Sequence, residues 1–414
     1  MPKTQIGGRV LGTSSLFGDL LVLDCASFIA GPAAATILSD YGARVIKIEP
    51  PGIGDSYRQI INLPNMPVCD RDYFWELDSR NKESLALDLK QDSAQAVLST
   101  LIARADVFIT NFPGPIRERL KLRAEDVLKQ NEKIIYASLT PYGEEGPEKD
   151  RTGYDTTAWW ARSGLMHFVR AGVTAEPSFS IPGMGDHPTA VALFGAIVSG
   201  LYRRERTGKG GVVSTSLLAN GLWSASCLLQ ARLHDAEFRQ RPPRYQRNPL
   251  TELYRCRDDR WFILASVNQQ REWPLLTECL ERPEWLSDPR FATIEKRLEN
   301  SGDLTRAIES VIVTRDWPDW HKSFLRHGLT VGVVGAPDDH LDDAQIAANG
   351  MFPEYADGNG LRTIDNPVRV SGTERQAPRM APAIGAHTRA ILEELGLSGR
   401  EISAMIEAGA AGTA

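Results

Sequence analysis

The sequence has few of the residues that build disulfide scaffolds or metal sites. Its five cysteines form no C-x-x-C pair, so we expect thiols in a reducing compartment rather than disulfides; they are Cys25, Cys69, Cys227, Cys256 and Cys279. The seven histidines include no H-x-x-x-H or H-E-x-x-H pair. The sequence therefore predicts no metal site.

Long hydrophobic runs and an excess of basic residues are also missing. The longest apolar run, residues 190–202, is interrupted by Gly195 and Ser199 and is too short to span a bilayer. The opening residues MPKTQIGGRV lack the hydrophobic region of a signal peptide, so we expect a cytoplasmic protein. A net charge of −6 gives no sign of the basic surface that nucleic-acid binding requires. Neither a membrane nor a nucleic acid is therefore expected as a partner.

What is present begins with a strand–helix–strand unit between Gly18 and Asp55. Residues 20–24 form a short apolar run that fits a buried strand, and Ala30-Gly31-Pro32 starts a helix. Residues 45–48 form a second apolar, β-branched strand. This arrangement predicts a parallel sheet and an α/β fold. With 414 residues, of which 42% are hydrophobic, the chain is long enough for two domains.

The turn inside this unit argues against a dinucleotide cofactor. It reads CASFIAGPAAA, with one glycine instead of the G-x-G-x-x-G of a dinucleotide-binding turn. Glu49 does end the second strand, where such folds keep a ribose-binding acid. A pyrophosphate needs close backbone approach, however, and Ser27, Phe28 and Ile29 obstruct it. We therefore expect no nicotinamide or flavin.

Further strand-and-turn patterns follow along the chain. An alternating strand over residues 84–90 comes after Arg80-Asn81-Lys82, which reads either as a phosphate contact or as a solvated turn. A strand over residues 106–110 leads into Asn111-Phe112-Pro113-Gly114. An aromatic side chain followed by arginines suits adenine and phosphate, and an ordinary strand-to-helix turn is the equal alternative.

Six such segments, in this order, resemble the family III CoA transferases from about residue 18 to about residue 407. They are the AGP turn with GARVIKIEPPGIGD, the RNK strand, NFPG, the TPYGEEGP loop, GYD with SGLM, and RRERTGKG before a strand. The family includes the formyl-CoA and carnitine CoA transferases and the α-methylacyl-CoA racemases. The resemblance implies an α/β fold with a large Rossmann-like parallel-sheet domain, a smaller α+β domain and an interlocked dimer.

The domains are expected to follow one another with a return to the first. Residues 1–227 are predicted to form the N-terminal part of the large CoA-binding domain, 228–330 a linker and the small domain, and 331–414 a segment that returns to the large domain. A hairpin is predicted at Leu253–Cys256 and Trp261–Ala265, and a short strand at Val368–Gly372.

The resemblance also implies a coenzyme A thioester as substrate and no resident cofactor. Many family members carry a polar residue where this chain has Ile29 and an arginine where it has Pro50. By the resemblance, the residues expected to contact CoA are Ser27, Ile29, Ala30, Arg80, Asn81, Lys82, Asn111, Phe112, Arg119 and Tyr142.

The carboxylate nucleophile of the family is missing from its expected place. Moving CoA between acids needs a carboxylate that attacks the donor thioester. The transferases keep an Asp roughly a dozen residues before a second Gly-Asp, here Gly185-Asp186. That position falls on Thr174 or Ala175, and the only carboxylate in residues 167–185 is Glu176. Glu176 is either a substitute nucleophile or an exposed loop residue.

The racemase branch of the family uses a His and an Asp to exchange the α-proton. Its His corresponds to Tyr154 and its Asp to Asp186. A tyrosine, with an unperturbed pKa of about 10, does not readily replace that His. Asp186 is then expected to cap the following helix or to orient the substrate.

Three functions remain open: a transferase that uses Glu176 or another nucleophile, a subunit paired with a homologous catalytic subunit, and a CoA-thioester isomerase or racemase. We favour the subunit of a CoA transferase with a succinyl-CoA-type donor, since benzylsuccinate-type enzymes of the family combine two homologous subunits. The partners are thus acyl-CoA, a carboxylic acid, and a second copy or a homologous chain. Trp159, Trp160 and Phe168 are predicted to lie in the core or beside a bulky acyl group.

Overall fold

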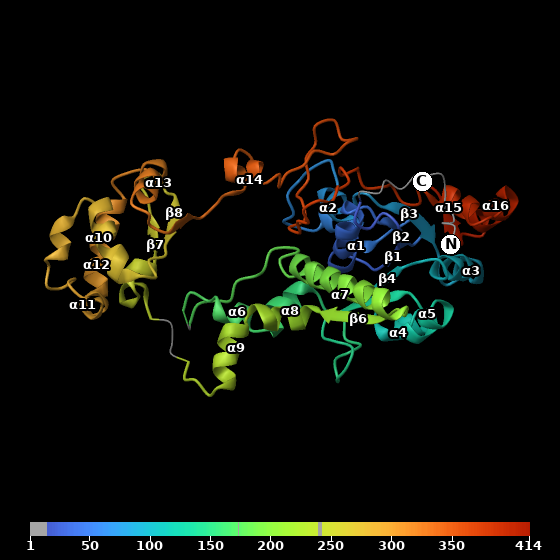
Figure 1. Cartoon of the computed structure of the whole chain (residues 1–414), viewed down its shortest axis with the longest axis horizontal. Coiled ribbons are helices and arrows are strands. Elements are labelled where there is room, and N and C mark those ends of the chain that lie inside the picture. The colour runs from blue at the N-terminus through green and yellow to red at the C-terminus, as the bar shows by residue number, and fades with distance from the viewer. Residues whose placement is uncertain (1–14, 173, 239–241) are drawn as a thin grey trace. The chain divides into compact units, whose positions relative to one another are not determined.

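The computed structural model describes residues 15–172, 174–238 and 242–414, which divide into two compact units (Figure 1). The opening residues, on which the expected absence of a signal peptide depends, lie outside these ranges. Of the described residues, the larger unit comprises 15–169, 177–236 and 348–414, and the smaller unit comprises 170–172, 174–176, 237–238 and 242–347. None of the helices in the described parts of the chain combines the length and apolar character needed to cross a membrane.

A seven-stranded sheet forms the centre of the larger unit, in the order β10-β3-β2-β1-β4-β5-β6. All neighbours pair in parallel except β10, which runs antiparallel to β3. The strands are β1 (Leu21–Cys25), β2 (Arg44–Glu49), β3 (Glu83–Leu87), β4 (Val107–Thr110), β5 (Ile135–Thr140), β6 (Gly211–Ser216) and β10 (Ala411–Gly412).

Helices cover both faces of this sheet, which explains why β1, β4 and β5 are buried along their whole length. Successive β1 residues point to opposite faces. Val22 packs with α1 (Ala30–Asp40) and α7 (Asp186–Thr207), and Leu23 packs with the helices of the other face. These are α3 (Asp92–Ile102), α5 (Ala124–Gln130), α15 (Thr388–Glu394) and α16 (Gly399–Glu407).

The other helices of the larger unit connect the strands. They are α2 (Tyr73–Ser79), α4 (Gly114–Arg119), α6 (Leu165–Phe168), α8 (Leu217–Ser224) and α9 (Ser226–Leu233). Two further segments matter for the site: the 3₁₀ segment η1 (Ser56–Asn62) and the π-helical segment η2 (Asp155–Arg162). The turns that join β1 to α1 and β4 to α4 lie at the carboxyl edge of the sheet.

The smaller unit has a three-stranded antiparallel sheet in the order β7-β8-β9. Its strands are β7 (Leu253–Arg255), β8 (Trp261–Leu264) and β9 (Val331–Val333). Its helices are α10 (Gln269–Cys279), α11 (Ile294–Glu299), α12 (Ser301–Ile312) and α13 (Trp317–Arg326), and α14 (Ala344–Ala348) lies at its boundary. Phe262, Trp320 and Phe324 are buried in its core.

The predicted fold class is confirmed in its large parallel-sheet unit and its small α+β unit; the interlocked dimer stays a prediction. The compact units change after residues 236 and 347, so that α9 and β9 stay with the elements that they follow, and the domain boundaries at 227 and 330 stay a prediction. The strand predicted at Val368–Gly372 is wrong. A side chain, and not a neighbouring strand, bonds to the backbone of this segment: the Tyr41 hydroxyl donates to the Val368 carbonyl at 2.8 Å.

Candidate functional site

The strand order places a topological switch point between β1 and β4, where the direction of strand addition reverses, and the carboxyl edge of the sheet there will be called the crevice edge. Ligands of open parallel sheets bind at such a switch point, beyond the carboxyl ends of the strands. Ser27 follows β1 and Asn111 follows β4, and the two join across the crevice edge. The Ser27 N–H donates to Asn111 Oδ1 at 2.9 Å, and Asn111 Nδ2 donates to the Ser27 carbonyl at 2.7 Å.

The β1–α1 turn is held in a strained conformation at this edge. Phe28 has a φ of +64°, which is uncommon for a residue with a side chain. Its N–H donates to Asp55 Oδ1 at 3.1 Å, and its ring meets the Tyr154 ring edge-on, with 5.6 Å between centroids. Asp55 thus supports a turn that the local sequence alone does not favour. Ile29 and Ala30, which follow, are buried at the start of α1.

A fully buried network of two lysines and two aspartates lies beneath this turn. Lys82 Nζ lies 2.8 Å from Asp24, and Lys47 Nζ lies 3.7 Å from Asp24 and 2.6 Å from Asp55. Burial raises the pKa of Asp24, but Lys47 and Lys82 outweigh it and hold that pKa below its ordinary value. Burial lowers the pKa of Lys82, although Asp24 opposes the effect. The four side chains, two cations and two anions, will be called the lysine network.

The cations predicted at the RNK segment therefore face carboxylates inside the protein. Arg80 pairs with the two Asp40 oxygens at 3.0 and 2.7 Å, and Asn81 donates to Asp40 at 3.1 Å. Lys82 also donates to the Pro32 carbonyl at 2.7 Å. These contacts favour a structural role for Arg80 and Lys82. Contact between this segment and CoA stays a prediction.

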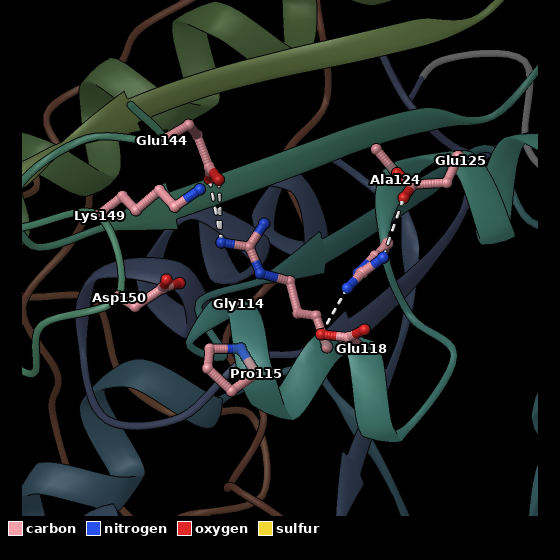
Figure 2. A pocket seen from close by; sticks show the side chains of 10 residues that line it. Gly114, Pro115, Glu118, Ala124, Glu125, Glu144, Lys149 and Asp150 are labelled. Atoms are coloured by element: carbon pink, nitrogen blue, oxygen red, sulfur yellow. Dashed lines mark hydrogen bonds and ion pairs between the residues drawn. The ribbon is translucent and has the colours of Figure 1, made fainter. Parts of the chain in front are cut away.

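A pocket of about 360 Å³ lies beside α4 (Figure 2). Buried Arg117 crosses its wall: Nε donates to the Phe112 carbonyl at 2.7 Å, and the guanidinium pairs with Glu144 at 3.0 Å. Figure 2 shows Glu144 and Lys149 on one side of the pocket and Glu118 and Glu125 on the other. The residues lining it are Gly114, Pro115, Arg117, Glu118, Arg123, Ala124, Glu125, Glu144, Lys149 and Asp150.

Two arginines line the pocket, Arg117 and Arg123, and the predicted Arg119 is not one of them. Arg119 is exposed and is not among the lining residues, whereas Arg117 lines the wall. Helical spacing could have indicated Arg117, because it lies three residues before the apolar Leu120 and so shares the buried face of the helix with it. Tyr142 is half-buried, packs against the cluster of Trp159 and Trp160, and lies under the guanidinium of Arg151.

The two predicted catalytic carboxylates lie in different units. Glu176 is exposed and belongs to the smaller unit, in the short segment 170–176. Asp186 is half-buried and is the first residue of α7 in the larger unit. Among the described residues, no backbone or side-chain group donates a hydrogen bond to the Asp186 carboxyl, so Asp186 does not cap α7 through its side chain. Trp159 and Trp160 are buried and stacked on one another.

Two further ionisable side chains, which the sequence did not indicate, lie beside Asp186. His187 Nε2 lies 3.1 Å from Asp78 Oδ1, and the Tyr57 hydroxyl donates to Asp78 Oδ2 at 2.6 Å. Burial lowers the pKa of His187, but Asp78 outweighs it and raises that pKa to about 9. Burial, with Asp155 and Asp78, raises the pKa of Asp186 to about 8. Over the described residues, no three His, Cys, Asp or Glu side chains converge to hold a metal ion.

The sequence and the fold both match those of known proteins. The model of CoA-transferase family III matches residues 18–388. The (R)-2-hydroxy-4-methylpentanoate CoA-transferase of Clostridioides difficile is 29% identical and covers 94% of this chain and 97% of its own length. The succinyl-CoA:glutarate CoA-transferase of Mus musculus is 31% identical, over 94% of this chain and 90% of its own. A CAIB/BAIF family protein from Brucella suis matches the fold with a TM-score of 0.81 and 26% identity, covering 92% of this chain and all of that one. The chain belongs to CoA-transferase family III.

Proposed function

We propose that this chain takes part in moving CoA between two carboxylic acids, from a succinyl-CoA-type donor, together with a homologous subunit that carries the nucleophilic carboxylate. The observation that carries the pairing is the loop before α7. Its only carboxylate in residues 167–185 is Glu176, which lies close to Thr174 and Ala175, the positions where the resemblance implies the Asp of the transferases. The donor is supported by the name of the mouse relative.

The transfer needs a carboxylate and no redox cofactor. A carboxylate oxygen attacks the donor thioester carbonyl, the C–S bond breaks, and CoA leaves as a thiolate from an enzyme-bound anhydride. The thiolate then attacks the enzyme-side carbonyl, which frees the donor acid and leaves an enzyme thioester. The acceptor carboxylate attacks that thioester and receives CoA by the same two exchanges.

The crevice edge and the pocket provide places for the two ends of the thioester. Ser27, Ile29 and Ala30 follow β1, and Asn111 and Phe112 follow β4, so their edge is proposed to receive the pantetheine arm and the acyl group. The pocket beside α4 begins at the next residues and offers cations to the nucleotide phosphates. In this proposal Tyr142 lies between the two, and Arg80, Asn81 and Lys82 support the edge from within.

The two arginines of α4 give a matched test of the pocket. Arg117→Met removes the guanidinium that joins Phe112, Ser138 and Glu144, and is expected to weaken CoA binding by at least tenfold. Arg119→Met changes an exposed neighbour and is expected to change the affinity less than threefold. Calorimetric titration with CoA measures both, and equal effects would remove the pocket from the proposal.

A partner chain is supported by apolar side chains on α8 and α9. Trp223 and Leu233 are each 79% exposed, and α9 buries none of its residues. Large apolar side chains with this exposure are typical of an interface when they gather on one surface. We propose that a second family III chain covers it, as a copy of this chain or a homologue. Sedimentation of the wild type and of Trp223→Glu tests this, because a dimer should dissociate in the variant alone.

The nucleophile is identified by trapping its acyl and CoA adducts. The purified chain is incubated with succinyl-CoA, alone and with co-purifying homologues, and intact mass reveals adducts that hydroxylamine removes. An adduct on the homologue, formed only when this chain is present, supports the proposed pairing. An adduct on Glu176, absent in Glu176→Gln, would reject the pairing and make the chain self-sufficient. Exchange of the α-proton with deuterated water, without CoA transfer, would reject transfer in favour of a racemase or isomerase.

A further inference from the structure

Apolar side chains from three segments of the larger unit meet at the crevice edge. The first segment is the β1–α1 turn, which contains Phe28 and Ile29. The second is the start of η2, where the Tyr154 ring meets the Phe28 ring edge-on, with 5.6 Å between centroids. The third is the chain over residues 178–184, which leads into α7. The three segments are far apart in the sequence, and the fold of the larger unit brings them together.

The third segment is fixed by a tight turn over residues 181–184. The Met184 N–H donates to the Ile181 carbonyl at 3.2 Å. Gly183 has a φ of +76°, which suits the third position of a type II turn with a proline before it. Before the turn, Trp160 Nε1 donates to the Ser178 carbonyl at 2.8 Å. The backbone of the turn is therefore held by the protein itself.

The turn lies against the other two segments. A Cβ added at Gly183 would lie 3.7 Å from Ile29 Cδ1, so the turn borders the residue that opens α1. Directly after the turn, the Gly185 N–H donates to Asp155 Oδ2 at 3.1 Å, and Asp155 follows Tyr154 in the chain. The side chains of the turn and the ring of Tyr154 are thus placed on the same edge.

Much of the apolar surface at this edge is open to water. Ile181 is 70% exposed, Tyr154 51% and Met184 40%. Phe28 is held at a positive φ beside them, and backbone strain of this kind gathers at functional sites. Ligands of open parallel sheets bind beyond the carboxyl ends of the strands, at the switch point where these side chains lie. The position therefore favours the acyl chain of a substrate as the group that covers them.

The same three segments offer no free positive charge to a second carboxylate. Residues 27–30, 153–155 and 178–184, all described, contain no lysine, arginine or histidine, and their one ionisable acid is Asp155. His187 lies against Gly183, but its ring is paired with Asp78 at 3.1 Å. A carboxylate that lost its water at this edge would be left unpaired beside apolar side chains, which is costly.

We propose that the acid that accepts CoA has an uncharged, apolar chain, and that this chain binds against Phe28, Tyr154 and the turn at residues 181–184. The inference depends on the proposed CoA transfer. A donor thioester is also held through its CoA moiety, so a succinyl group needs few contacts at this edge. A free acid binds by its own chain, so the apolar contacts decide which acid accepts CoA. The released succinate finds no cation here and leaves.

The test compares two acids of equal chain length as acceptors of CoA from succinyl-CoA. Pentanoate ends in a methyl group where glutarate ends in a second carboxylate. Formation of each new acyl-CoA, with release of succinate, is followed with the homologous subunit present where transfer requires it. In the wild type, kcat/KM should be at least about 30-fold higher for pentanoate than for glutarate.

Met184→Gln and Ile181→Gln test the turn, because each puts a polar side chain where an apolar one is exposed. Each should lower the pentanoate-to-glutarate ratio of kcat/KM by about five- to tenfold, mainly through the KM for pentanoate. Val212→Thr makes the same kind of change near the amino end of β6, at the opposite edge of the sheet, where Val212 is 52% exposed. It should change the ratio by less than about twofold.

Three results would overturn the inference while leaving the transferase intact. They are transfer to glutarate as fast as to pentanoate, a ratio unchanged in both variants of the turn, and a change that follows dissociation of these variants in sedimentation. The last result would make the turn part of an interface between chains. A wild-type chain that transfers CoA to neither acid, with or without a homologue, would instead end the proposed function and this inference with it.

Discussion

The two charged clusters of the larger unit differ in their balance of charge. The lysine network has two cations for two carboxylates, Asp24 and Asp55, and all four are fully buried. A second set at the start of α7 has one cation, His187, for the three carboxylates Asp78, Asp155 and Asp186, and Asp186 is half-buried; these four side chains will be called the α7 cluster. Balanced charges can all persist in the interior, where each supports the backbone around it. In the unbalanced set, burial and the neighbouring carboxylates Asp155 and Asp78 raise the pKa of Asp186 to about 8.

The position of each cluster agrees with this difference. The lysine network lies beneath the β1–α1 turn and holds Ala26 and Phe28 by hydrogen bonds. The α7 cluster lies beside the same turn, where Gly183 borders Ile29. One cluster thus shapes the crevice edge and the other presents a titrating group near it.

The largest expected effect comes from removing one charge of the lysine network. Lys47→Met leaves Asp24 and Asp55 buried with one cation fewer and should lower the free energy of unfolding by about 3–5 kcal/mol. His187→Gln in the α7 cluster should lower it by less than about 1.5 kcal/mol. Urea unfolding at pH 7 measures both, and similar costs would remove the distinction between the clusters.

A smaller effect is expected from Asp78→Asn, which weakens the ion pair of the α7 cluster while keeping its shape. The variant loses the charged hydrogen bonds to His187 and Tyr57, so the free energy of unfolding should fall by about 1.5–3 kcal/mol. The pKa of His187 should fall at the same time, since Asp78 is what raises it. An NMR titration of the His187 ring protons checks the second part, and a pKa that stays near 9 would contradict it.

The smallest effect is a change in how stability depends on pH. The pKa of Asp186 is about 8 in the folded protein and about 3.8 in the unfolded chain. The free energy of unfolding that this difference contributes is therefore fully present below about pH 4 and is lost as the pH rises through 8. His187, at about 9 folded and 6.5 unfolded, loses its contribution between pH 6.5 and 9. As the pH is raised from 5 to 9, the Tm of Asp186→Asn should therefore rise relative to that of the wild type by about 2–4 °C. Parallel Tm curves for the two proteins would show that Asp186 is ionised throughout.

Much of the fold could be predicted because local patterns carry it. The strands over residues 20–24 and 45–48 read as apolar runs, since helices cover both faces of the sheet. Val368–Gly372 also contains β-branched residues, but the Tyr41 hydroxyl donates a hydrogen bond to the Val368 carbonyl, which a neighbouring strand would otherwise use. Local propensity could not reveal that competition.

The site was harder to predict because its partners come from distant segments. Asp78 and His187 are 109 positions apart and meet only once α2 and α7 are packed on the sheet. Arg80 and Lys82 read as exposed cations until their buried partners, Asp40 and Asp24, are known. Ser27 and Asn111 were predicted separately for the same ligand, and the parallel order of β1 and β4 joins them.

The raised pKa of Asp186 distinguishes the two clusters, and a titration of its carboxyl carbon tests it most directly. The protein is labelled with carbon-13 at the aspartate carboxyls, and the spectrum of Asp186→Asn identifies the Asp186 signal by difference. The account predicts that this signal titrates with a midpoint near pH 8, while the signal of Asp24 remains that of a carboxylate down to below pH 4. A midpoint for Asp186 below pH 5 would contradict the account, because the carboxyl would then be ionised wherever the enzyme works.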